Sequence, residues 1–147
     1  MKRTYHSHSV RDTAQISAVV ASQVGAEGAT ILIYGELGAG KTEFVRGLVE
    51  AVGGDTSEVS SPTFVLIQEY LVGRRVSHID LYRLSEREAL DFEPQITELT
   101  GTSAIVVIEW ADRLSRPLGD VIKVRIEDKG QEERMITVEL PEAGGSA

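Results

Sequence analysis

The chain has 147 residues, of which 41% are hydrophobic and 26% are charged, proportions that are typical of an ordinary globular domain. It contains no cysteine, which excludes disulfides and thiolate metal sites, and its 15 basic and 23 acidic residues give a formal charge of −8, which disfavours direct capture of a nucleic-acid backbone. No apolar run is long enough to cross a membrane, so we expect one cytoplasmic domain over residues 1–147, with flexible ends at about 1–9 and 142–147.

The first half of the chain predicts two helices around a buried strand. Apolar residues at helical spacing predict an amphipathic helix over residues 12–24. Residues 29–34, ATILIY, form a short apolar run between glycines and predict a central strand. A second helix is predicted from Lys41 to Val52, directly after a glycine-rich turn.

The second half predicts strands on both sides of a helical segment. Residues 61–84 predict a β-hairpin that turns around Gly73 and Arg74. Residues 85–99 begin with the capping-box pattern of Ser85 and Glu88, and Pro94 within them predicts short helices rather than one long helix. Three further strands are predicted over residues 104–110, 120–128 and 133–140.

Residues 35–42, GELGAGKT, match the phosphate-binding pattern G-x-x-x-x-G-K-[ST] in full, between a predicted buried strand and a predicted helix. Glycines in such a loop let backbone N–H groups converge on phosphate oxygens, and the helix N-terminus adds a positive dipole. We expect Lys41 to reach the β- and γ-phosphates of ATP and the Thr42 hydroxyl to bind Mg²⁺. A chance glycine-rich turn is the alternative, but it would not require the flanking strand and helix. The predicted ATP-binding residues are Gly35, Leu37, Gly38, Ala39, Gly40, Lys41, Thr42 and Glu43.

Two acids end predicted strands and are candidate catalytic groups beside Lys41. Glu109 ends the more apolar strand and Asp80 ends the weaker one, and carboxylates at such strand ends point toward the ligand crevice of an open α/β sheet. Either acid could instead cap a turn, and this alternative is stronger for Asp80. Trp110 could cover a nucleotide or belong to the core, and His78 is interpreted as a packed or hydrogen-bonded core residue.

Four stretches together resemble one family. They are YGELGAGKT at 34–42, SSPTFVLIQEY at 60–70, HIDLYRL at 78–84 and IEWADRL at 108–114. In this order and spacing they resemble the TsaE family, small bacterial P-loop ATPases required for making threonylcarbamoyladenosine in tRNA. The resemblance runs from about residue 10 to about residue 140. Glu43 departs from it, because the family commonly has a hydroxyl residue at this position.

The resemblance implies a single-domain α/β fold of the P-loop NTPase type, with a mixed, mainly parallel central sheet flanked by helices. It implies Mg²⁺-dependent ATP hydrolysis, with the metal near Thr42 and Glu109 and with Asp80 and a switch-like loop at Thr63 near the γ-phosphate. It also implies two partner proteins: TsaD, which transfers the threonylcarbamoyl group, and TsaB. The chain would then meet tRNA only indirectly, and we expect it to reset this complex between turnovers.

The residues also leave other functions open. A small-molecule kinase would use the same lysine and hydroxyl, but no lid segment is evident between the P-loop and Glu109. A GTPase is disfavoured because the chain has no asparagine for a guanine-reading N-K-x-D motif. A P-loop that only binds nucleotide is disfavoured by the intact Lys41, Thr42 and Glu109. Arg83 and Arg134 are candidates for an arginine that stabilises phosphate charge.

Overall fold

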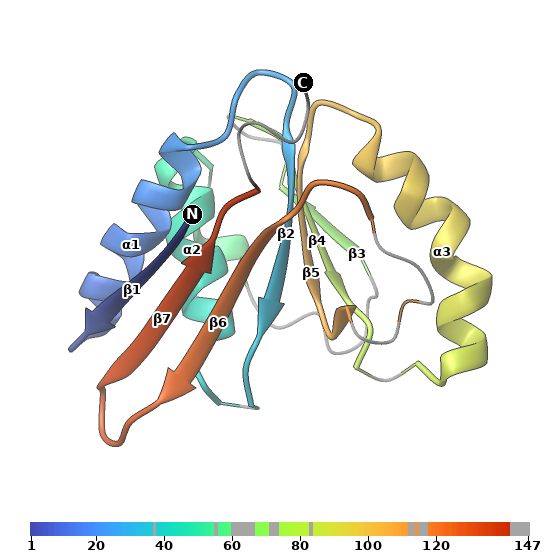
Figure 1. Cartoon of the computed structure of the whole chain (residues 1–147). Helices are drawn as coiled ribbons and strands as arrows, with labels where there is room; N and C mark the ends of the chain where they lie inside the picture. Colours follow the sequence, from blue (N-terminus) through green and yellow to red (C-terminus); the bar gives the residue numbers. More distant parts are fainter. Residues whose placement is uncertain are drawn as a thin grey trace.

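A seven-stranded mixed sheet forms the centre of the computed structural model (Figure 1). The structure describes residues 1–36, 38–54, 56–59, 67–70, 74–82, 84–111, 114 and 118–141. The strands are β1 Lys2–Ser7, β2 Ala29–Tyr34, β3 Ile67–Tyr70, β4 Val76–Asp80, β5 Ile105–Glu109, β6 Ile122–Asp128 and β7 Arg134–Glu139. The helices are α1 Val10–Ser22, α2 Lys41–Ala51 and α3 Glu86–Thr100, with a 3₁₀ turn at Thr56–Glu58.

The strand order is β1-β7-β6-β2-β5-β4-β3, and the four inner strands β6, β2, β5 and β4 run parallel to one another. The outer pairs β1/β7, β7/β6 and β3/β4 are antiparallel. In this register Glu109 lies beside both Ile33 and Asp80, so β2, β4 and β5 end at the same edge of the sheet. The mixed sheet with a parallel centre confirms the predicted fold class.

Helices cover both faces of the sheet, with α1 and α2 on one side and α3 on the other (Figure 1). Successive side chains of a strand point to opposite faces. In β2, Ile31 and Ile33 pack with Phe44 of α2, whereas Leu32 packs in the cluster that contains Ile96 of α3. This double burial explains why the two predicted central strands read as continuous apolar runs. No helix among the described residues is long and apolar enough to cross a membrane.

Most predicted elements are confirmed within a few residues of their expected ends. The predicted hairpin is the antiparallel pair β3/β4, in which Gln68 lies opposite His78, although its expected turn at Gly73 lies outside the described residues. The capping box is also present: the Glu88 N–H donates to the Ser85 hydroxyl and the Ser85 N–H donates to the Glu88 carboxylate, both at 3.1 Å.

The prediction of a flexible N-terminal segment over residues 1–9 is wrong. Residues 2–7 form β1, with Lys2 opposite Glu139 and Ser7 opposite Arg134. Only Ser7 of this strand is buried, so its sequence, KRTYHS, shows no apolar alternation. Backbone pairing with β7 orders the strand, and a sequence pattern does not reveal such pairing. The opposite end, 142–147, lies outside the described residues.

The prediction of short helices around Pro94 is also wrong, because α3 continues through it. Proline removes one hydrogen bond, the one to the carbonyl four residues earlier, which here belongs to Leu90. Leu90 is 52% exposed, so water can supply the lost donor. Ala89 and Ile96 are fully buried on either side of the proline and hold both halves of the helix on the protein.

Helices α1 and α2 approach closely at Gly47. A Cβ atom at this position would lie 2.7 Å from the Ala14 Cα and 3.0 Å from the Ser17 Cβ. The Ser17 hydroxyl also donates to the Phe44 carbonyl at 2.8 Å, which joins the two helices directly. The backbones of α1 and α2 are so close that no side chain fits at Gly47, which explains a glycine within this helix.

We predict that Gly47→Ala destabilises the protein. Alanine gains about 1 kcal/mol over glycine in helix propensity, but overpacking against backbone typically costs about 1–3 kcal/mol, so we expect a small net loss in the free energy of unfolding. Urea denaturation measures the change, with Glu50→Ala on the exposed side of the same helix as a control expected within about 0.5 kcal/mol of wild type. A more stable Gly47→Ala variant would contradict the close packing.

Candidate functional site

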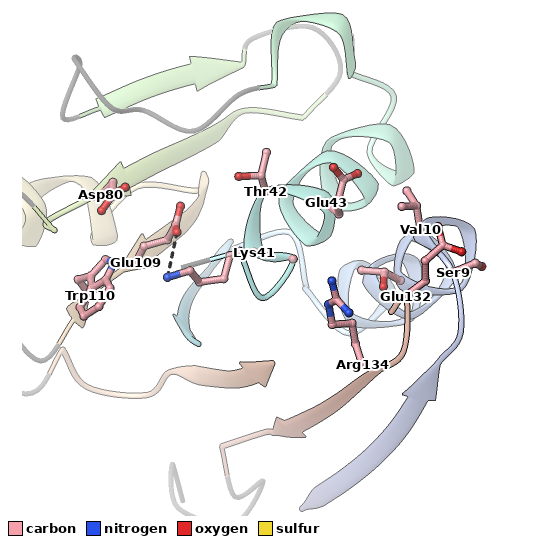
Figure 2. Close-up of a pocket in the computed structure, with 13 residues that line it drawn as sticks. Ser9, Val10, Lys41, Thr42, Glu43, Asp80, Glu109, Trp110, Glu132 and Arg134 are labelled. Atoms are coloured by element: carbon pink, nitrogen blue, oxygen red, sulfur yellow. Dashed lines mark ion pairs between the residues drawn. The ribbon is translucent and has the colours of Figure 1, made fainter. Parts of the chain in front are cut away.

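A cavity of about 470 Å³ lies where β4 and β5 end and α2 begins. Figure 2 shows Asp80, Glu109 and Trp110 at one end of it and Lys41 and Thr42 in the middle. The cavity is therefore built by the same strand-to-helix turn and the same strand ends that the sequence analysis singled out.

The turn between β2 and α2 needs glycine at three positions. Gly38 and Gly40 have φ angles of 81° and 107°, in the left-handed region that favours glycine. A Cβ atom on Gly35 would lie 2.8 Å from the Ile126 carbonyl oxygen. The turn can therefore pass close to β6 and present its backbone to the cavity. Two further residues of this loop were predicted to bind ATP. Ala39 is buried, and Leu37 lies outside the described residues.

The Lys41 ammonium is held inside this turn. Lys41 is 6% exposed, and its Nζ donates to the Gly35 carbonyl at 2.8 Å. The same atom lies 3.6 Å from Oε1 of Glu109 and 4.8 Å from the centroid of a Trp110 ring. A carbonyl, a carboxylate and an aromatic face thus stabilise the charge at the wall of the cavity.

Glu109 is buried at the end of β5 and uses its two carboxylate oxygens differently. Oε1 faces Lys41, and Oε2 lies 2.5 Å from Nε2 of His78. Glu109 is 4% exposed and His78 is fully buried. The structure therefore places Glu109 in the cavity, as predicted, and adds a buried histidine partner 31 positions away in sequence.

Asp80 lines the cavity and also caps a turn. Its Oδ1 accepts a hydrogen bond of 2.9 Å from the Tyr82 N–H. Burial raises the pKa of the Asp80 carboxyl above its ordinary value, and the negative charge of Glu109 raises it further, against the lowering effect of the Tyr82 N–H. Asp80 is therefore positioned both as an acid of the cavity and as a turn cap, so these two interpretations are compatible.

Trp110 lies both at the cavity and against the core, so its position is compatible with both alternatives that the sequence left open. Its ring lines the cavity and also packs on the α3 side of the sheet, 4.9 Å from the Tyr82 ring. Its φ angle is 62°, which is uncommon for a bulky residue and marks a strained backbone directly after Glu109.

The other end of the cavity also contains residues that the sequence did not indicate as site residues. Ser9 and Val10 lie at the start of α1, and Glu132 lies in the hairpin between β6 and β7. Ser9 is the N-cap of α1, since its hydroxyl accepts from the Asp12 N–H at 3.0 Å. A polar residue such as Ser9 just before an apolar helix is recognisable in the sequence as a possible N-cap. That Ser9 lies near the P-loop depends on the fold.

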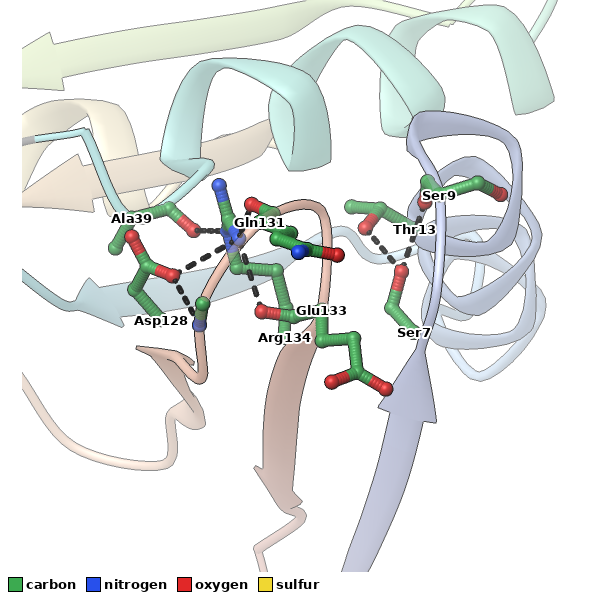
Figure 3. A network of polar contacts seen from close by, with 9 residues as sticks. Ser7, Ser9, Thr13, Ala39, Asp128, Gln131, Glu133 and Arg134 are labelled. Carbon is green, nitrogen blue, oxygen red and sulfur yellow. Dashed lines mark hydrogen bonds and ion pairs between the residues drawn. The ribbon is translucent and has the colours of Figure 1, made fainter.

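Arg134 fastens the β6–β7 hairpin to the P-loop (Figure 3). Its Nε donates to the Ala39 carbonyl at 2.8 Å, and its Nη1 contacts the Asp128 carboxylate at 3.1 Å. Nη1 also donates to the carbonyls of Gln131 and Glu133. These bonds make Arg134 a structural brace of the loop. Arg83, the other candidate arginine, and Thr63 lie outside the described residues.

Thr42 and Glu43 both line the cavity at the first turn of α2. The Glu43 carboxylate forms an ion pair of 2.5 Å with Nη1 of Arg46 on the same helix, so a cation already balances its charge. The Thr42 hydroxyl and the carboxylates of Asp80 and Glu109 are hard oxygen donors, which suit Mg²⁺. Among the described residues no group of three or more acidic or histidine side chains that could hold a metal ion occurs.

The raised pKa of Asp80 predicts how stability responds to Asp80→Asn. An acid whose pKa is higher in the folded than in the unfolded protein lowers stability as pH rises between the two values. At pH 7 the substitution should therefore raise the melting temperature, while at about pH 3, below the ordinary Asp pKa of about 3.9, the difference should disappear. Thermal unfolding at both pH values measures this. A stabilisation that is equal at both would show that ionisation is not its cause.

Comparison with known proteins shows which family the chain resembles. Residues 7–136 match the model of the family described as "Threonylcarbamoyl adenosine biosynthesis protein TsaE". A tRNA threonylcarbamoyladenosine biosynthesis protein TsaE from Treponema pallidum is 35% identical over 130 residues, which cover 86% of this chain and 94% of that protein. The protein of the same name from Haemophilus influenzae is 41% identical over 86 residues, 56% of this chain, and the match spans about half, 53%, of that protein.

The fold is also shared with a solved structure. The crystal structure of YdiB from Bacillus subtilis superposes with a TM-score of 0.76 at 24% identity, covering 99% of this chain and 90% of that one. This likeness concerns the architecture, whereas the family model spans most of the chain and includes the P-loop, Asp80 and Glu109. The chain belongs to the TsaE family of threonylcarbamoyl adenosine biosynthesis proteins.

Proposed function

We propose that the chain is a Mg²⁺-dependent ATPase that assists a TsaD–TsaB complex in forming threonylcarbamoyladenosine in tRNA. One observation carries the proposal: the buried Lys41 ammonium lies in a glycine-rich turn at a helix N-terminus, 3.6 Å from the strand-end acid Glu109. A cation, backbone donors and a carboxylate then converge on one cavity, the arrangement that phosphoryl transfer to water requires. Family membership favours this accessory role over a small-molecule kinase.

The triphosphate of ATP would lie over the P-loop, where glycine N–H groups and the start of α2 favour negative charge. Lys41 would leave the Gly35 carbonyl and Glu109 and bind phosphate oxygens instead. The nucleoside would extend toward the end of the cavity formed by Ser9, Val10 and Glu132, away from Asp80 (Figure 2).

The Thr42 hydroxyl and the Glu109 carboxylate are the groups that would hold Mg²⁺, which when bound neutralises phosphate charge. Glu109 and Asp80 lie opposite each other across β5 and β4, and either can orient a water molecule toward the γ-phosphate. Arg134 lies on the far side of Lys41 from these acids, so its role is to support the loop (Figure 2).

The formal charge of −8 supports a protein as the direct partner. Binding of a nucleic-acid backbone draws its free energy from basic residues that release counterions, and this chain has an excess of acids. The tRNA would therefore be reached through TsaD and TsaB in the cytoplasm. Hydrolysis would reset that complex, with the Thr63 loop and the segment around Asp80 reporting the γ-phosphate.

We predict that Lys41→Ala and Glu109→Gln separate binding from hydrolysis. Loss of the lysine removes charge-assisted bonds to phosphate and should weaken ATP binding about tenfold or more. Glu109→Gln should keep affinity within a few-fold but lower kcat by about 10²–10⁴. Trp110, the single tryptophan, gives a fluorescence signal for binding, and phosphate release measures turnover. Glu139→Gln, at the exposed end of β7, is the matched control. Wild-type binding by Lys41→Ala would refute the P-loop assignment.

The reset role predicts that a variant defective in hydrolysis supports few rounds of modification. Purified TsaD, TsaB, tRNA and the other substrates are combined with this chain or with its Glu109→Gln variant, and modified nucleoside is counted per complex. We expect wild type to give many turnovers and the variant to stop after about one. Equal multiple turnover by both proteins would exclude resetting by hydrolysis while leaving ATP binding untouched.

A further inference from the structure

His78 is a fully buried polar residue on the apolar α2 face of β4. It lies beside Val107 of β5, and the same register places Asp80 beside Glu109. Val76, His78 and Asp80 therefore share one face of the sheet with the two β5 residues. An apolar residue would fill this position at no desolvation cost, so the imidazole requires a compensating bond.

That bond is made with Glu109. Nε2 of His78 lies 2.5 Å from Oε2 of the carboxylate, and Nδ1 has no hydrogen-bond partner among the described residues. With a proton on Nε2 alone, the ring donates to Glu109 and leaves no buried N–H unpaired. The imidazole is thus oriented by one polar contact, which is the contact with the acid of the site.

The two oxygens of Glu109 have separate partners, Lys41 at Oε1 and His78 at Oε2. Lys41 is the partner that a phosphate would attract, whereas His78 is enclosed and cannot reach the cavity. We propose that His78 is a positioning residue, which holds the Glu109 carboxylate in place while Lys41 binds nucleotide. This inference rests on the proposed function and adds to it a residue that acts through Glu109.

The first test compares His78→Leu, which removes the donor, with His78→Gln, whose amide nitrogen can occupy the place of Nε2. Partners that orient a metal-binding carboxylate typically contribute about 10–100-fold in metal affinity or activity. We expect His78→Leu to lower kcat by about that factor, with KM within about threefold, and His78→Gln to recover most of the loss. ATP binding, followed by Trp110 fluorescence, should depend less strongly on Mg²⁺ than in wild type, and only in the leucine variant. Turnover and Mg²⁺ response equal to wild type in a folded His78→Leu would overturn the proposal.

Ser77→Ala is the matched control, since Ser77 is fully buried in the same strand and its hydroxyl has no hydrogen-bond partner among the described residues. This neighbour points to the opposite face of the sheet, so its substitution should leave turnover unchanged. An equal loss of kcat in Ser77→Ala and His78→Leu would attribute the effect to packing of β4 and overturn the proposal.

A double-mutant comparison tests whether His78 acts through Glu109. In the Glu109→Gln background, His78→Leu should change kcat by less than about twofold, because there is no carboxylate left to position. An undiminished effect in that background would overturn the proposal. A wild-type protein without Mg²⁺-dependent turnover would instead contradict the proposed function, so the two failures are distinguishable.

A spectroscopic measurement on the wild-type protein needs no substitution at His78. In protein labelled with ¹⁵N-histidine, we expect a downfield, hydrogen-bonded Nε2–H proton for His78 that shifts upfield in Glu109→Gln. The signal should persist when a non-hydrolysable ATP analogue and Mg²⁺ are added. Its loss on nucleotide binding would show that His78 releases Glu109 when the acid is needed, which would overturn the proposal even if His78→Leu does not fold.

Discussion

The ion pair between Lys41 and Glu109 is the interaction on which the site depends. It joins the first residue of α2 to the last residue of β5, and both side chains are almost completely buried. Two charges in such a place require close, well-directed partners. The Gly35 carbonyl supplies one for the lysine and His78 supplies one for the acid. The parallel centre of the sheet makes this possible, because it brings β2, β4 and β5 to an end at one edge.

Much of the fold and the centre of the site were predictable because their signals are local. The strands β2 and β5 are apolar on both faces, and the P-loop glycines occupy left-handed or crowded positions that only this residue tolerates well. Glu109 could be identified because a strand end fixes the direction of its side chain. Each of these inferences rests on residues that are close together in the sequence and on a rule that holds in most α/β proteins.

The features that were not predicted depend on residues far apart in the sequence. Strand β1 exists because β7 offers it backbone partners, 127 to 137 positions away. Arg134 reaches the Ala39 carbonyl from a hairpin 95 positions later, and the bond between His78 and Glu109 spans 31 positions. In α3 a local rule failed, since burial of Ala89 and Ile96 outweighs the bond lost at Pro94. Tertiary packing decides in all four places.

The charge of the cavity bears on how a nucleotide can bind. Its ionisable lining side chains are four carboxylates and two cations, namely Glu43, Asp80, Glu109, Glu132, Lys41 and Arg134. Arg134 is already engaged with Asp128, and Glu43 is paired with Arg46. A triphosphate would therefore meet mainly Lys41 as an attractive charge while approaching Asp80 and Glu109. Like charges at short range repel strongly, so a further cation between the phosphates and the acids would stabilise such a complex. The charges that the fold collects at one edge of its sheet therefore support the proposed role of a divalent cation.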